Sequence, residues 1–102
     1  MRMTYTARRE FLLEKAMCLA EKISILGLTY SSLARYSRVT PQLIQYYFSS
    51  NQILRREALK YALAKKNMSV IIQGFVLKPP LLPNKELGKF KANLITYLTK
   101  NL

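Results

Sequence analysis

Two helix-start signals stand close together in the middle of the chain. Thr29 precedes an apolar-patterned segment, and Thr40 is followed at once by Pro41, a pair that suits an N-cap and the first helical position. Between them, Ser37 and Arg38 leave room only for a tight turn. The spacing therefore predicts two short helices, over residues 30–36 and 41–48, with a turn between them.

A longer helix is expected before this pair and another after it. Apolar residues recur every three or four positions between residues 7 and 26, which predicts one buried helix face: Leu12, Ala16, Leu19, Ala20, Ile23 and Leu26. We expect Thr6 to cap this helix and Gly27 to follow it in a left-handed conformation. The polar run 49–52 is typical of a capping box before a helix that lasts to about Lys66.

The packing of the two short helices also follows from the apolar pattern. We expect Leu33 and Ala34 to face inward from the first helix, Val39 to fill the turn, and Ile44 and Tyr47 to anchor the second helix. A small residue such as Ala34 suits the crossing point of two steeply inclined helices. This arrangement matches a helix-turn-helix, whose second helix enters the major groove of DNA.

The C-terminal third is interrupted by proline. Residues 68–77 are predicted to form a further helix rather than a strand, and the run 78–83, with three prolines, is a stiff connector. Asn84 is expected to cap a last helix with an apolar stripe suited to dimerisation: Leu87, Phe90, Leu94, Tyr97 and Leu98. The predicted organisation is a DNA-binding region over residues 1–66 and a helical extension over residues 67–102.

Composition limits the possible functions. The 102 residues fit one domain, and 17 Lys and Arg against 5 Glu give a net charge of +12. Such a charge attracts polyanions: nucleic acid first, and an anionic membrane surface or acidic protein second. Because the chain contains neither Asp nor His, we predict no catalytic residues, no metal site and no enzyme activity. A single cysteine and no visible signal peptide or membrane segment lead us to expect a cytoplasmic protein.

The run from Leu28 to Asn51 resembles the DNA-binding region of TetR-family transcriptional repressors. The most specific part is the Tyr46-Tyr47-Phe48 sequence, followed by Ser50 and preceded by Val39-Thr40. The segment 12–27, which includes Ala20-Glu21-Lys22, looks like the first helix of that family. The resemblance covers about residues 7–66 and implies an all-α fold and a homodimer that represses transcription from an inverted-repeat operator.

The chain also departs from the family pattern. Ser37-Arg38 stands where the family usually has Ala-Gly, so Arg38 must take the left-handed turn position, at a strain on the order of 1 kcal/mol. Asn51 stands where the family often has Lys. The extension over residues 67–102 is too short for the usual inducer-binding domain. The resemblance thus implies a reduced repressor, like small plasmid or phage autoregulators, with no cofactor and no small-molecule ligand.

Side-chain chemistry assigns roles in DNA binding. Glutamine pairs bidentately with adenine, and leucine packs on the thymine methyl group, so the predicted base contacts are Thr40, Gln42, Leu43 and Gln45. Phosphate contacts position the protein without specifying sequence. The predicted ones are Tyr30, Arg35, Arg38, Tyr46, Asn51, Arg55 and Arg56. Arg2, Arg8 and Arg9 are further candidates for backbone or minor-groove contacts.

Two other functions compete with repression. A centromere-like or architectural DNA-binding protein would coat repeated sites with the same helices. A basic interaction module would instead dock the stripe from Leu87 to Leu98 on a membrane surface or a partner protein. The same stripe suits self-pairing, which requires no additional partner.

Overall fold

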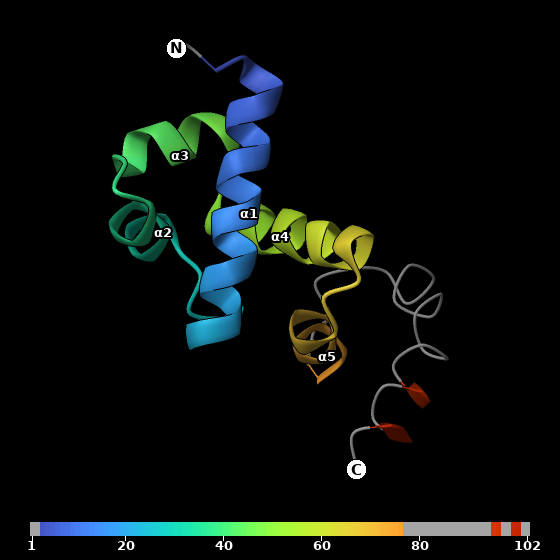
Figure 1. Ribbon diagram of the computed structural model, residues 1–102. Helices are drawn as coiled ribbons and strands as arrows, with labels where there is room; N and C mark the ends of the chain where they lie inside the picture. The colour runs from blue at the N-terminus through green and yellow to red at the C-terminus, as the bar shows by residue number, and fades with distance from the viewer. Residues whose placement is uncertain (1–2, 77–94, 97–98, 101–102) are drawn as a thin grey trace.

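The computed structural model describes residues 3–76, 95–96 and 99–100, and its regular structure there is helical (Figure 1). Within residues 3–76, five helices follow one another: α1 (Tyr5–Ile23), α2 (Tyr30–Ser37), α3 (Pro41–Tyr47), α4 (Asn51–Lys65) and α5 (Met68–Val76). No strand occurs among the described residues, so the expected all-α class is confirmed at this level. The predicted helix over residues 68–77 is confirmed by α5.

The helices are arranged around α1. In Figure 1, α2 and α3 lie on one side of α1 and α5 lies on the other, while α4 crosses behind it. One core cluster joins α1, α2, α3 and α4 and contains Leu12, Leu13, Ala16, Leu19, Leu28, Leu33, Ala34, Ile44, Phe48, Leu54 and Ala58. A second cluster joins α1, α4 and α5 and contains Met17, Ala20, Ile25, Leu59, Ala62, Leu63, Val70 and Ile71. Because α1 belongs to both clusters, it fixes where the two short helices lie.

Most of the predicted helix starts are confirmed. The hydroxyl oxygens of Thr29 and Thr40 accept hydrogen bonds from the backbone N–H groups three residues on, at 3.1 Å and 3.2 Å. Two details differ from the prediction. Thr4 rather than Thr6 caps α1, and Ser50 alone caps α4, because residue 53 is Ile and cannot return a bond to the cap. The reciprocal capping box lies instead at α2, between Thr29 and Ser32.

The predicted C-terminal end of α1 is wrong. The helix ends at Ile23, and Ser24, not Gly27, takes a positive φ of 97°. This turn buries Ile25, with 1% of its surface exposed, while Ile23 and Leu26 stay 47% and 59% exposed. The apolar face predicted for α1 therefore loses its last two members.

A single side chain of α5 explains where α1 ends. The Gln73 carbonyl oxygen accepts a hydrogen bond from the Ile25 backbone N–H at 2.5 Å, and its amide donates to the Ala20 carbonyl at 3.0 Å. On its other contact, α5 packs closely against α4 at Gly74. A Cβ atom there would lie 2.7 Å from Cδ2 of Leu59 on α4.

Candidate nucleic-acid interface

Helix α3 presents polar side chains from a short, firmly anchored element. Ile44 and the following Phe48 have no exposed surface, and they pack into the cluster that holds α1, α2 and α4. Gln42, Gln45 and Thr40 are exposed, as expected for residues that contact DNA bases. Leu43 is half-buried and lines a cleft with Val39 and residues of α1. The four predicted base contacts therefore lie on one short helix and its cap.

The turn between α2 and α3 has the predicted backbone. Arg38 is left-handed, with φ 59° and ψ 43°, and its backbone N–H donates a hydrogen bond to the Ala34 carbonyl. Leu33 and Ala34 are buried, Val39 packs against the same cluster, and Tyr47 is partly buried beside it. The expected packing of the two short helices and their turn is therefore present, with an arginine where a glycine would be least strained.

The neighbouring Ser37 adds a second unfavourable feature to this turn. Its hydroxyl oxygen is buried and has no hydrogen-bond partner within the part of the chain that the structure describes. A buried hydroxyl without a partner destabilises a protein by about 1–3 kcal/mol. The two residues that depart from the Ala-Gly pattern, Ser37 and Arg38, are thus the two that strain the turn.

Three of the predicted phosphate contacts are exposed. Arg35 and Arg38 project from the end of α2 and from the turn, and Tyr46 is 71% exposed on α3. The Tyr46 ring also packs edge-on against Tyr5 at the start of α1, with ring centroids 6.0 Å apart. These three exposed side chains belong to α2, to the turn and to α3.

Three other predicted phosphate contacts hold the fold together. The Tyr30 hydroxyl donates to the Phe48 carbonyl at 2.6 Å, and Nε of Arg55 donates to the Leu28 carbonyl at 3.0 Å. The Asn51 carbonyl oxygen accepts from the Tyr30 backbone N–H at 2.9 Å. Among the described residues, Arg55 uses only its Nε atom in this bond, so its terminal guanidinium nitrogens can still donate to a phosphate. Tyr30 could donate its hydroxyl proton to a phosphate only by breaking its hydrogen bond to the Phe48 carbonyl. Arg56 is half-buried on α4.

A basic stripe lies on α1, of which sequence analysis named Arg8 but missed Lys15 and Lys22. Arg8, Lys15 and Lys22 recur at seven-residue spacing. The Lys15 and Lys22 ammonium groups lie 5.9 Å and 5.2 Å from the centre of the Tyr36 ring on α2, and Arg8 lines the cleft beside Val39 and Leu43. This stripe therefore extends the cationic side of α2 and α3. The seven-residue spacing was the signal that could have revealed it.

Three acidic residues that the structure describes join α1 to α4 and to the segment after it. Glu14 accepts a hydrogen bond from the Tyr61 hydroxyl at 2.8 Å, Glu21 accepts one from the Asn67 amide, and Glu57 pairs with Arg9 at 3.4 Å. Arg9 also lies 5.2 Å above the Phe48 ring, so it is held between helices rather than directed outward. No acidic residue occurs between residues 22 and 56, which leaves α2, the turn and α3 without negative charge.

Other sequence features do not add to this interface. Burial raises the pKa of the Cys18 thiol, and the nearby carboxylates of Glu14 and Glu21 raise it further, as expected for an unreactive cysteine. The predicted dimerisation residues, Leu87, Phe90, Leu94, Tyr97 and Leu98, lie outside the described residues. Among the described residues, no cluster of side chains suits a metal ion, and no helix has the length and apolar character needed to cross a bilayer.

Comparison with known proteins adds no identification. No family model, curated protein or solved structure matches the chain.

Proposed function

We propose that this protein is a sequence-specific double-stranded DNA-binding protein that acts as a transcriptional repressor. The observation that carries the proposal is the helix-turn-helix itself: a short α3 anchored by buried Ile44, with Gln42 and Gln45 exposed on it. Such a helix fits the major groove, where glutamine reads adenine. The basic residues around it supply the sequence-independent attraction to phosphate.

Repression would follow from occupying a promoter. The protein binds as a homodimer, and each subunit places α3 in one of two successive major grooves, about 34–36 Å apart on the duplex. The operator is accordingly an inverted repeat. This part of the proposal is supported by the resemblance of residues 28–51 to TetR-family repressors.

The first test is fluorescence anisotropy with two duplexes, the region upstream of the protein's own gene and a scrambled version, across about 50–200 mM salt. We expect binding to the natural duplex to stay selective as salt rises, because non-specific phosphate binding falls steeply in this range. If both duplexes lose binding equally, an unbiased selection of DNA sites follows. Failure of that selection to enrich any sequence would refute sequence-specific binding.

Variants then separate base contacts from phosphate contacts. Gln42→Ala and Gln45→Ala are each expected to weaken specific binding by about 1–3 kcal/mol and to leave non-specific binding nearly unchanged. Gln52→Ala, which removes an exposed glutamine from α4, is the matched control. Arg35→Ala should weaken binding to both duplexes. Equal losses on both duplexes from the Gln42 and Gln45 changes would contradict base recognition by α3.

The oligomeric state is tested separately. Truncation after Pro83 is expected to give monomers in sedimentation and poor affinity for an operator with two half-sites. Dimers that persist in the truncated protein would show that the stripe from Leu87 to Leu98 is not the main interface. In that case the same sedimentation assay, applied to surface variants of the remaining helices, would locate the contact.

A further inference from the structure

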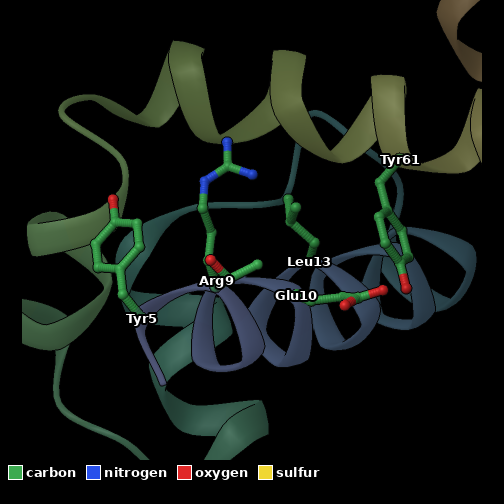
Figure 2. Close-up of a pocket in the computed structure, with 6 residues that line it drawn as sticks. Tyr5, Arg9, Glu10, Leu13 and Tyr61 are labelled. Carbon is green, nitrogen blue, oxygen red and sulfur yellow. The ribbon is translucent and has the colours of Figure 1, made fainter. Parts of the chain in front are cut away.

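A groove between α1 and α4 has tyrosine rings at both ends. It encloses about 280 Å³ and is lined by Tyr5, Thr6, Arg9, Glu10, Leu13 and Tyr61. Figure 2 shows Tyr5 at one end and Tyr61, from α4, at the other, with Leu13 between them. The apolar floor and the two rings suit a small planar group.

The free charge in this groove is negative. Arg9 turns toward α4, where it pairs with Glu57, so its charge is already balanced (Figure 2). Glu10 is exposed, and within the described part of the chain its carboxylate takes part in no hydrogen bond or ion pair. In Figure 2 this carboxylate points toward Tyr61. The Tyr61 hydroxyl in turn donates to a second carboxylate, that of Glu14.

The titration of Tyr61 agrees with a negative local field. Burial, the hydrogen bond to Glu14 and the negative charges of Glu14 and Glu10 raise the pKa of Tyr61 to about 12. Each of these charges would favour a bound cation for the same reason that they disfavour a tyrosinate. Two neighbouring carboxylates beside one tyrosine are unusual in a chain with a net charge of +12.

We propose that this groove binds a small aromatic monocation, with the ammonium group at the Glu10 carboxylate and the aromatic ring over Leu13 toward Tyr5. The Lys65 ammonium group already lies 5.4 Å from the centre of the Tyr61 ring, so the attraction on a ligand cation comes from the Glu10 and Glu14 carboxylates. We expected no small-molecule ligand, because the extension after Lys66 is too short for an inducer domain. The groove lies in the N-terminal half, where that argument does not apply.

Tyr5 connects this groove to α3. Its ring lies 4.8 Å from that of Tyr47 and 6.0 Å from that of Tyr46, measured between centroids. The inference nevertheless does not depend on the proposed function, because ligand binding is tested on the free protein. Failure to bind DNA would leave it unaffected.

The test uses three probes with the same ring and different charges: 2-phenylethylammonium, 2-phenylethanol and phenylacetate. Each is titrated into the full-length protein and followed by two-dimensional NMR of the backbone amides. We expect the ammonium compound to shift the amides of the groove residues, and the alcohol and the carboxylate to bind at least about threefold more weakly. Equal binding of all three compounds, binding of phenylacetate alone, or no shifts at the groove would each overturn the proposal.

Two variants test the charge. Glu10→Gln is expected to weaken binding of the ammonium compound by about two- to fivefold, the range of a solvent-accessible ion pair. Glu21→Gln is the matched control, since it removes the same charge from α1 outside the groove. Because Glu10 is exposed and takes part in no internal bond, its variant should remain folded, which the amide spectrum itself reports. Equal weakening by both variants would indicate a general charge effect and would also overturn the proposal.

Discussion

The hydroxyl of Tyr30 donates a 2.6 Å hydrogen bond to the backbone carbonyl of Phe48, joining the first turn of α2 to the end of α3. This bond sets the distance across the helix-turn-helix. It also uses the hydroxyl proton that a contact between Tyr30 and a phosphate would require. Tyr30 is therefore a structural residue of this unit, and its hydroxyl is not free to donate to a ligand.

Tyr30→Phe is expected to lower the free energy of unfolding by about 1 kcal/mol, because the carbonyl of the buried Phe48 loses its donor. The slope of DNA affinity against salt should not change, since no phosphate contact is removed. Urea denaturation and salt titrations measure the two effects. A salt slope reduced by about one would show that Tyr30 contacts phosphate after all.

Ser37→Ala is expected to stabilise the protein by about 1 kcal/mol, since it removes a buried hydroxyl that has no partner among the described residues. Ser32→Ala is the contrasting variant. It breaks the reciprocal capping box with Thr29 and should destabilise by about 1 kcal/mol. Thermal unfolding of both variants distinguishes them by sign, and a destabilised Ser37→Ala would mean that the hydroxyl has a partner.

Arg38→Gly separates stability from binding. Glycine relieves the left-handed strain of about 1 kcal/mol, partly offset by the greater entropy of the unfolded chain, so a gain of up to about 1 kcal/mol is expected. DNA affinity should fall at the same time if the exposed guanidinium contacts phosphate. Denaturation should therefore show higher stability, and anisotropy should show weaker DNA binding. A variant that is more stable but binds DNA as tightly as before would show that Arg38 does not contact the DNA.

Gln73→Glu tests the connection between α5 and the end of α1. The carboxylate can still accept from the Ile25 N–H, but it cannot donate to the Ala20 carbonyl, so destabilisation by about 1–3 kcal/mol is expected at neutral pH. A protonated carboxyl regains the donor. The difference in unfolding free energy between the variant and the unsubstituted protein should therefore narrow as the pH falls toward about 4, the ordinary pKa of glutamate. A gap that stays constant with pH would argue against a hydrogen bond to Ala20.

Tyr61 makes stability sensitive to alkaline pH. Burial and its bond to Glu14 raise the pKa of Tyr61 to about 12, from 10. Above pH 10 the unfolded chain loses this proton while the folded chain keeps it, so the contribution of Tyr61 is complete below pH 10 and is lost as the pH rises to about 12. Tyr61→Phe should lose less stability across this interval. Thermal unfolding of both proteins across this pH range measures the effect. If both lose the same amount of stability, the loss belongs to other groups.

Local signals in the sequence were sufficient for the helix-turn-helix. Thr29 and Thr40 cap helices through atoms three residues away, and the short distance between the two helix starts predicts a turn at Ser37 and Arg38. The left-handed conformation of Arg38 was implied only by the resemblance to a family that usually has glycine there. The end of α1 could not be predicted in this way. Ser24 takes the positive φ because Gln73 holds Ile25, and that bond spans 48 positions of the chain.

The roles of the basic and polar residues were harder to predict for a chemical reason. A phosphate oxygen and a backbone carbonyl accept hydrogen bonds from the same donors, so neither Tyr30 nor Arg55 carries a local sign of which it binds. Their partners, Phe48 and Leu28, lie 18 and 27 positions away. Arg35 and Arg38 remain predicted phosphate contacts, and both are exposed.

The basic stripe and the acidic residues of α1 lie on different edges of the helix, and this separation of charge makes the molecule turn in an electric field. Arg8, Lys15 and Lys22 border α2 and α3, whereas Glu10, Glu14 and Glu21 border α4 and α5. A polyanion attracts the first edge of α1 more strongly than the second, so it exerts a torque as well as a pull. An approaching molecule would be turned before contact, and a larger fraction of its collisions would begin with α3 facing the polyanion.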